Sequence, residues 1–302
     1  MIHDFGIGIV AFGHPESLTH LVLAIRRYWP TLAVGIVDHT EGGAASLQRL
    51  CAEMDVDYQV ATNAGFAAGI NRLLDWSQPL RTLVVLNPDL ELDDIAFIEE
   101  AVRVQQTEPR VLALGTTLRD AAGKSVAGIM PGLGLGLVGF RLQTTERRGV
   151  VDVPTVHGAF LVLDASCLRP LGGLDTSLFL YGEEFEISEL ARNNDRRIVF
   201  LPSSGVRHQS EGRPASRVQV VMNASNLLYL AKKWKKTGLM LWISVRILTR
   251  RDLPRGMRWK LIRWSLRRTP ADASHSRYGE QAAQVWRTFE RMMSISGGTG
   301  PV

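Results

Sequence analysis

Cysteine is scarce in this sequence: the chain has two among 302 residues, Cys51 and Cys167. Both stand in apolar, helix-like stretches, and neither belongs to a spacing that ligates metal. A disulfide framework and a cysteine metal site are therefore excluded. We expect two buried thiols in a protein of a reducing compartment.

Long hydrophobic runs are also missing. No stretch reaches the roughly 18 consecutive apolar residues that indicate a membrane span. The nearest, Gly238 to Leu248, has eleven residues and contains Arg246. The first residues, Met1 to Asp4, do not begin the basic and then apolar order of a secretory signal. The sequence predicts a cytoplasmic protein that is not integral to a membrane, and it leaves peripheral attachment open.

Neither low hydrophobicity nor a large net charge is present, so general disorder is excluded. Hydrophobic residues make up 45% and charged residues 22%, near the globular average, and the net charge is +5. The charge is uneven, however. The segment 232–268 has thirteen basic residues against one acid, Asp252, and is therefore +12, which leaves −7 for the rest. Five of the seven tryptophans also lie beyond residue 217. This asymmetry points to a separate role for that segment.

Short apolar runs alternate with helical patterns through the first 110 residues. Strands are predicted at 7–11, 32–37, 58–60 and 82–86, and helices at 15–28, 44–54, 67–76 and 93–106. Such alternation indicates a parallel sheet covered by helices on both faces. Ligands of open α/β sheets bind beyond the carboxyl ends of the strands. The polar residues at those ends are Asp38, Asn63 and the Asn87-Pro88-Asp89 turn.

The rest of the chain is less regular. Residues 112–151 give no clear pattern, and the glycine-rich run 131–139 lacks the strand and helix that flank a phosphate loop, so we interpret it as a surface loop. Further strands are predicted at 150–153, 158–163 and 197–201, and helices at 183–193 and from the N-cap Asp164 to about Gly172-Gly173. From 218 onward the pattern is helical.

Three clusters are candidates for chemistry, and each also has a structural interpretation. Asp89 follows an apolar strand, where a carboxylate can hold a divalent cation against a diphosphate or can cap the next helix. The segment from Asn63 to Asn71 places two glycines and two asparagines at a helix start, which suits phosphate binding or close packing. The acids of 183–186 suit a solvated helix N-terminus, or a general base beside apolar neighbours.

Taken in order, these pieces resemble the inverting family 2 glycosyltransferases of the GT-A fold, in particular their rhamnosyltransferase-like branch. The similarity covers about residues 7–208. It rests on Val37-Asp38, Asn63-x-Gly-Phe-Ala-Ala-Gly-x-Asn71, Leu86-Asn-Pro-Asp89, His157-Gly-Ala-Phe160, Gly172-Gly-Leu-Asp175, Phe179-Leu-Tyr-Gly-Glu-Glu184 and Val206-Arg-His208.

The resemblance implies a role for each matching position. Asp38 is expected to bind the base or ribose of a nucleotide. Asp89 and His208 are expected to hold Mg²⁺ or Mn²⁺, and Glu184 is the expected general base, with Glu183 as second choice. The nucleotide and diphosphate pocket is expected to include Asn63, Gly65, Asn71 and Asn87. The sugar and acceptor pocket is expected to include Gly158, Ala159, Asp175 and Tyr181.

Three departures from the family's pattern bear on these roles. Asn87 replaces the first acid of the metal motif, which is common in this branch, and His39 stands where the family usually has Asn. Glu184 and Glu186 replace aspartates. A glutamate reaches about one bond further, and a misplacement of roughly 1 Å can cost about 100-fold in rate. Either the backbone is set back to compensate, or Glu183 is the base, or activity is low.

The resemblance implies a GT-A catalytic domain over 1–217, with a nucleotide-binding half to about 110 and an acceptor half after it, followed by a helical, basic, tryptophan-rich region over 218–302. The implied activity is hexosyl transfer, with L-rhamnose from dTDP-rhamnose or a related dTDP- or UDP-sugar as donor. The implied acceptor is a glycan or lipid-linked hydroxyl in bacterial surface polysaccharide (O-antigen) synthesis.

Two other functions stay open. A sugar-phosphate nucleotidyltransferase usually carries a basic, glycine-rich nucleotide loop near the first strand, and Phe12 to Glu16 offers no Lys or Arg there. A catalytically weakened sugar-nucleotide binding protein is the second alternative, which the Glu184 replacement makes possible.

The basic segment 232–268 has three interpretations. We favour peripheral docking on an anionic leaflet, with tryptophans at headgroup depth, because the family often extends lipid-linked glycans. A solvated basic face packed on the catalytic domain is the second. Binding of single-stranded nucleic acid is the third, and we do not expect it.

Overall fold

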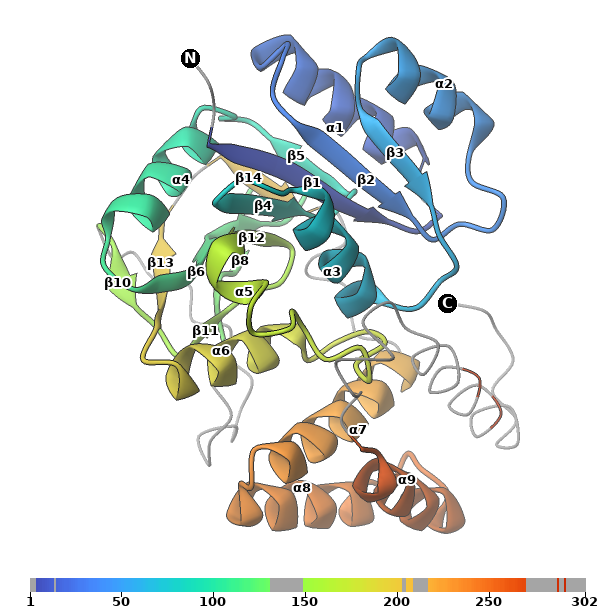
Figure 1. Cartoon of the computed structure of the whole chain (residues 1–302). Coiled ribbons are helices and arrows are strands. Elements are labelled where there is room, and N and C mark those ends of the chain that lie inside the picture. The colour runs from blue at the N-terminus through green and yellow to red at the C-terminus, as the bar shows by residue number, and fades with distance from the viewer. Residues whose placement is uncertain are drawn as a thin grey trace.

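The computed structural model describes residues 4–13, 15–130, 149–202, 205–208, 217–269 and the single residues 287 and 291. A large sheet forms the centre, with helices on both faces, and the helices of the range 217–269 lie together at one end (Figure 1). The predicted mixed α/β architecture is confirmed. The glycine-rich run 131–139 lies outside the described residues.

The central sheet contains eight strands. In spatial order they are β10 (Val151–Asp152), β13 (Arg197–Leu201), β6 (Val111–Thr116), β12 (Phe160–Asp164), β4 (Thr82–Leu86), β1 (Phe5–Ala11), β2 (Val34–Asp38) and β3 (Asp57–Val60). β1 is parallel to β2 and β4, and β2 to β3, as predicted. β12 runs antiparallel to β4 and pairs Phe160 with Leu86. The residues just before β12 therefore lie beside those just after β4.

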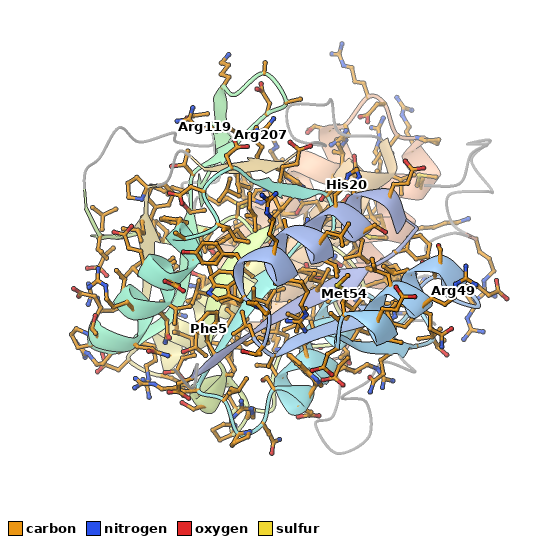
Figure 2. All side chains as sticks on the ribbon, turned by 90° about the horizontal axis from the view of Figure 1, so that it is seen from above. Phe5, His20, Arg49, Met54, Arg119 and Arg207 are labelled. Carbon is orange, nitrogen blue, oxygen red and sulfur yellow. The ribbon has the colours of Figure 1, made fainter. Side chains whose placement is uncertain are left out.

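Helices cover both faces because side chains alternate along each strand. In β4, Val84 and Leu86 face one hydrophobic core, and Leu83 and Val85 face the other. The first core includes α1 (Pro15–Tyr28), α2 (Ala45–Glu53) and α4 (Phe97–Thr107). The second includes α3 (Phe66–Trp76), α5 (Ala165–Leu168) and α6 (Glu183–Asn193). Figure 2 looks onto the side of α1 and α2, with Met54 just past the end of α2.

Two small sheets, which the sequence did not predict, lie near the end of β4. One has the order β5 (Leu90–Leu92), β14 (Val206–His208), β7 (Leu118–Arg119) and β8 (Ser125–Ala127), and the other joins β9 (Ile129–Met130) to β11 (Thr155–Val156). Figure 2 shows Arg119 and Arg207 together on the neighbouring strands β7 and β14. The pairing of β14 with β5 sets His208 opposite Leu90, the residue that follows Asp89.

The range 217–269 forms three helices, α7 (Arg217–Lys233), α8 (Thr237–Thr249) and α9 (Arg255–Arg267), here called the α7–α9 unit. Its apolar side chains belong to the same core as α3, α5 and α6. The helical prediction from 218 onward is confirmed, whereas the division into domains at 217 stays a prediction. No described helix is long and apolar enough to cross a membrane.

Two helix boundaries differ from the prediction. The helix expected at 93–106 begins at Phe97, because 90–92 pair as β5 and the Asp93 N–H donates to the Gly205 carbonyl at 2.8 Å. The helix capped by Asp164 starts as predicted, with Asp164 Oδ1 accepting from the Cys167 N–H at 3.0 Å. It ends early, at Leu168, because Pro170 has no N–H with which to extend it.

The expectation of two buried thiols is half correct. Cys51 is buried in the core of α1, α2 and α4, whereas Cys167 is only partly buried. Both are free thiols, so the prediction of no disulfide holds for them. Burial raises the pKa of the Cys51 thiol to about 11, which makes it unreactive at neutral pH.

Candidate active site

The site is built at the edge of the sheet where β2, β3 and β4 end. Asp38 is the last residue of β2, Asn63 follows β3, and Asn87 follows β4. The Asn87 N–H donates to the Ala159 carbonyl at 2.9 Å, which ties the turn after β4 to the segment before β12. The predicted positions at the ends of β2, β3 and β4 are therefore at one edge, and the Gly158-Ala159 segment joins them.

Asp89 and His208 meet across this edge, although 118 residues separate them in the sequence. The pairing of β5 with β14 brings them together, and Asp89 Oδ1 lies 3.2 Å from His208 Nε2. Their side chains are 19% and 7% exposed, so both are largely shielded from water. The two residues expected to hold a metal are thus neighbours.

This pair fits a divalent cation. A carboxylate oxygen and an imidazole nitrogen suit Mn²⁺, and two ligands at about 2.1 Å from one octahedral ion lie roughly 3 Å apart, close to the separation found. Among the described residues there is no group of three His, Cys, Asp or Glu side chains that could hold a metal. With Asp89 and His208 as its protein ligands, such an ion would have coordination positions left for a ligand such as a diphosphate.

His157 is a residue of this site that the sequence analysis missed. Its ring centroid lies 5.8 Å from that of His208, in an edge-to-face arrangement. Its Nδ1 accepts from the Ala159 N–H at 3.1 Å, so the ring proton of neutral His157 is on Nε2. A histidine without a metal-ligand spacing gives no signal by itself. Its place just before the Gly158-Ala159 pair was the available indication.

Asp38 is buried and already engaged by the protein. Its Oδ1 accepts from the Thr40 N–H at 2.8 Å, and its Oδ2 accepts from the Tyr58 hydroxyl. Burial, with the Asp38 carboxylate, raises the pKa of Tyr58 to about 12. These contacts hold the Asp38 side chain in place at the end of β2, and its predicted contact with a nucleotide stays a prediction.

His39, where the family usually has Asn, is 4% exposed. Its Nδ1 lies 3.3 Å from the Ala61 carbonyl and must carry the proton of that hydrogen bond. Within the described residues its buried Nε2 has no hydrogen-bond partner. Burial lowers the pKa of the ring, so His39 is neutral and presents an acceptor nitrogen toward Gly69 of α3.

The segment from Asn63 to Asn71 follows β3 in the chain and contacts the loop that precedes the acidic helix α6. Asn63 Oδ1 accepts from the Gly65 N–H at 3.1 Å, and Gly65 has φ +90°. A Cβ at Gly65 would stand 2.1 Å from the Phe179 carbonyl oxygen, so only glycine fits. The side chain of Asn71 is fully buried, and it bonds both the N–H and the carbonyl of Leu174, at 2.8 and 2.9 Å.

The three acids in the first turn of α6 have different surroundings. Glu186 is 1% exposed and bonds Lys233 Nζ at 2.6 Å and the Trp234 indole N–H at 2.9 Å, so its carboxylate is committed to the α7–α9 unit. Glu183 is 3% exposed, and its Oε1 has no partner within the described residues. Burial and the Glu184 charge raise the pKa of Glu183 to about 8.

Glu184 has surroundings that differ from those of both Glu186 and Glu183. It is half-buried, and burial raises the pKa of its carboxyl. Its Oε2 lies 3.9 Å from the place where a Cβ on Gly158 would stand. Thr155 Oγ1 donates to the Glu184 backbone carbonyl at 2.8 Å, which ties the start of α6 to β11. Glu184 is therefore the half-exposed acid that faces the Gly158 segment, and Gly158 follows His157.

Residues 175–182, here called the base loop, lead into α6. Asp175 Oδ2 accepts from the Tyr229 hydroxyl at 2.5 Å and from Lys233 Nζ at 2.8 Å. Burial alone would raise the pKa of Asp175, but Lys233 and the other donors hold it below its ordinary value. Tyr181 is half-buried, with φ +71°, and precedes Gly182 at φ +105°. The predicted acceptor residues Asp175 and Tyr181 thus lie in a loop that side chains of α7 hold in place.

Comparison with known proteins places this architecture. No family model matches the sequence. The chain is 23% identical over 214 residues to the low-salt glycan biosynthesis hexosyltransferase Agl10 of Haloferax volcanii, covering 66% of this chain and 64% of that protein. The chain therefore spans less than two thirds of this relative.

Solved structures match over more of the chain. GalNAc-T7 with UDP, GalNAc and Mn²⁺ has a TM-score of 0.59 at 14% identity, over 87% of this chain and 55% of its own. Mannosyltransferase PcManGT of Pyrobaculum calidifontis, in complex with GDP-Man and Mn²⁺, has a TM-score of 0.50 at 13% identity, over 99% and 76%. A mycobacterial protein has a TM-score of 0.51 at 14% identity, over 76% of this chain and 74% of its own. The chain shares the GT-A fold of the glycosyltransferases GalNAc-T7 and PcManGT.

Proposed function

We propose that the protein is an inverting, metal-dependent glycosyltransferase that moves a hexose from a nucleotide-diphosphate sugar to a hydroxyl acceptor. The proposal rests on the arrangement of side chains around Gly158. The Asp89–His208 pair, 3.2 Å apart, lies next to His157, and Glu184 Oε2 lies 3.9 Å from the Cβ position of Gly158. The printed ligands of the structural relatives, UDP and GDP-Man with Mn²⁺, support a nucleotide-sugar donor.

Asp89 and His208 would hold Mg²⁺ or Mn²⁺, which neutralises the diphosphate of the donor when bound. Glu184 accepts the proton of the acceptor hydroxyl. The acceptor oxygen forms a bond to the anomeric carbon as the bond from that carbon to the diphosphate oxygen breaks, so the configuration inverts. Burial raises the Glu184 pKa above its ordinary value, which makes the carboxylate a stronger proton acceptor, as a general base requires.

The donor we propose is dTDP-L-rhamnose or a related dTDP- or UDP-sugar, and the acceptor is a glycan or lipid-linked hydroxyl in bacterial surface polysaccharide synthesis. The order and spacing of the motifs from Val37 to His208 support this branch. The name of the Haloferax relative, a hexosyltransferase of glycan biosynthesis, supports the coarser class.

The test is to incubate the protein with Mn²⁺ and a panel of dTDP-, UDP- and GDP-sugars, and to identify the released nucleotide. Release of a nucleoside diphosphate that stops on addition of a chelator is the expected result. In a parallel incubation with a sugar phosphate and a nucleoside triphosphate, formation of pyrophosphate and a nucleotide sugar would instead indicate a nucleotidyltransferase. Tight binding of a nucleotide sugar with no turnover would indicate the weakened binding protein.

We also propose peripheral attachment to an anionic membrane through 232–268. The outward face of α8 carries exposed apolar side chains, Leu241 at 67% and Val245 at 50% exposed. The neighbouring α9 exposes Trp259 at 64%, with exposed Lys260 and Arg263 beside it. α8 and α9 lie at the end of the molecule farthest from the sheet (Figure 1). Apolar and tryptophan contacts flanked by cations suit an interfacial site on anionic lipid.

Vesicle sedimentation tests this attachment. We expect the protein to pellet with vesicles of phosphatidylcholine and phosphatidylglycerol, less with pure phosphatidylcholine, and less as salt rises. Equal binding to both vesicles, or none, would favour a solvated basic face. Binding of single-stranded nucleic acid in preference to either vesicle would favour the remaining interpretation.

A further inference from the structure

Asn226 of α7 contacts the two peptide groups that precede the acidic helix. Its Nδ2 donates to the Leu180 carbonyl at 2.8 Å and to the Tyr181 carbonyl at 2.7 Å. Asn226 is 2% exposed, and both hydrogens of its amide are used in these bonds. The next residues in the chain are Gly182 and the acids of α6, so Asn226 fixes the backbone immediately before the proposed base.

The backbone at this point needs such a restraint. Tyr181 and Gly182 both have φ in the left-handed region, +71° and +105°. A non-glycine residue holds this conformation only when its surroundings enforce it. The base loop is also bonded at Phe179, whose carbonyl accepts from the Phe66 N–H at 2.8 Å. Between that bond and α6, the Asn226 amide supplies the described hydrogen bonds to the Leu180 and Tyr181 carbonyls.

Arg268, just past α9, holds Asn226 in turn. Its Nη1 donates to Asn226 Oδ1 at 2.7 Å, and its Nη2 donates to the Ser177 carbonyl. The guanidinium is buried over the Tyr229 ring, 4.3 Å from its centroid, and over Trp264 at 5.2 Å. Burial lowers the Arg268 pKa to about 10, so it stays charged at neutral pH. The contacts run from the end of α9 through Arg268 and Asn226 to the base loop.

We infer that Asn226 is a positioning residue for the reaction, and that the α7–α9 unit belongs to the catalytic machinery through it. This inference rests on the proposed function, because the group that it positions is the base at Glu184 or Glu183. If the Leu180 and Tyr181 peptides lose their donors, the Tyr181-Gly182 turn relaxes and α6 shifts. A shift of roughly 1 Å in the base can cost about 100-fold in rate.

The test compares Asn226→Asp and Asn226→Ala with Ser265→Ala in the full chain. Asn226→Asp keeps the shape and an oxygen for Arg268 but removes both donors. Ser265 is a matched control, because it is buried between α9 and α7, where its hydroxyl lies 2.7 Å from that of Ser225, and it makes no described bond to the base loop. Melting temperature, donor KM, kcat and the pH dependence of kcat are measured for each.

We expect both Asn226 variants to lower kcat by about 10- to 100-fold, with donor KM within about 2-fold of the parent. The melting temperatures show that each variant is folded at the assay temperature. The acid limb of the kcat profile should move to lower pH, because a displaced base is less buried and its pKa falls toward the ordinary glutamate value. Loss of folded enzyme alone would also lower the apparent kcat at an unchanged donor KM, but it would leave the acid limb at the same pH, so the shift of this limb separates the two explanations.

The inference is overturned if the Asn226 variants have the kcat and pH limb of Ser265→Ala while Glu184→Gln or Glu183→Gln is inactive. In that case the proposed base stands and Asn226 does not position it. If both glutamine variants turn over like the parent, the base assignment itself fails, and the inference fails with it.

Discussion

At the scale of single residues, three glutamates within one turn of α6 differ in what surrounds their carboxyl groups. Glu186 is ion-paired to Lys233, and Glu184 is half-buried beside Gly158. Glu183 is buried, and one of its carboxyl oxygens has no hydrogen-bond partner in the described part of the chain. The base must reach the acceptor and must not be neutralised by a permanent partner. These conditions exclude Glu186 and favour Glu184 over Glu183.

Glu183 makes the pH dependence of stability testable. Its folded-state pKa of about 8 lies above the ordinary value of 4.5, so the folded protein takes up a proton between these values and the free energy of unfolding falls as pH rises from about 4.5 to about 8. Glu183→Gln removes this loss. We expect the variant to match the parent at pH 4.5 and to exceed it above pH 8 by at least about 1.4 kcal/mol, the equivalent of one pKa unit.

Urea unfolding at the two pH values measures this difference. Glu100→Gln, the same change at an exposed acid in the first turn of α4, is the control for a general effect of removing charge from a helix N-terminus. Equal stability of Glu183→Gln and the parent at both pH values would contradict the buried, protonated state of Glu183.

Asp89 makes metal use testable. We expect Asp89→Ala to weaken metal-dependent donor binding by more than about 100-fold, because it removes one of two proposed protein ligands. Isothermal titration with the donor, in Mn²⁺ and then in chelator, measures the effect. Asp93→Ala is the control, since that carboxylate pairs with Arg207 on the outer side of the same small sheet. Retained Mn²⁺-dependent binding in Asp89→Ala would remove Asp89 from the metal site.

At the scale of elements, the sequence pattern predicts the regular parts and misses the parts built by distant pairing. β4 and α1 match their predicted bounds because each is a local pattern of apolar residues with the period of a strand or a helix. β5 and β14 are three residues each, and β14 pairs with residues more than a hundred positions away, so no local pattern marks them.

The same limit applies to the candidate site. The family resemblance predicts Asp89 and His208 as joint metal ligands, and in the structure Asp89 Oδ1 lies 3.2 Å from His208 Nε2. The hydrogen bonds of Asn71 with Leu174 and the contacts of Asn226 with the base loop were not predicted, because each joins residues 45 to 103 positions apart. Neither set of contacts can be found until the positions of α3 and α7 relative to residues 174–182 are known.

The ion pairs of Lys233, the last residue of α7, yield a stability prediction. Lys233 Nζ bonds Glu186 at 2.6 Å and Asp175 at 2.8 Å, and both carboxylates are buried. Lys233→Met leaves two buried acids without their cation, so we expect a loss of about 3 kcal/mol in the free energy of unfolding. Arg110→Met is the control, because it breaks the exposed pair with Asp195 and should cost less than about 1 kcal/mol. Denaturant unfolding of both variants decides, and similar losses would contradict the account.

At the scale of the whole molecule, the charge asymmetry of the sequence corresponds to a separate face. The α7–α9 unit holds the +12 segment, and its outer helices α8 and α9 lie away from the sheet, while α7 contacts the base loop on the inner side (Figure 1). The same unit therefore carries the proposed membrane surface and the contacts that hold the base loop. A membrane bound at α8 and α9 would lie on the side of the molecule where the base loop is anchored.

This arrangement predicts that attachment and chemistry can be separated by mutation. Leu241→Asp with Val245→Asp should abolish binding to anionic vesicles, because it places two charges on the outward apolar face of α8. Turnover of a water-soluble acceptor should stay within about 2-fold, since no described contact joins these side chains to the base loop. Leu23→Asp, on the exposed side of α1, is the matched control. Unchanged vesicle binding in the double variant would exclude α8 as the docking face.

The most direct test of the central claim is single-turnover release of nucleoside diphosphate by the parent, Glu184→Gln and Glu183→Gln, with donor binding measured in parallel. We predict that Glu184→Gln binds donor and Mn²⁺ like the parent and loses turnover by at least about 100-fold, a typical contribution of a general base. Glu183→Gln should keep most of its turnover. Normal turnover by Glu184→Gln would exclude Glu184 as the base.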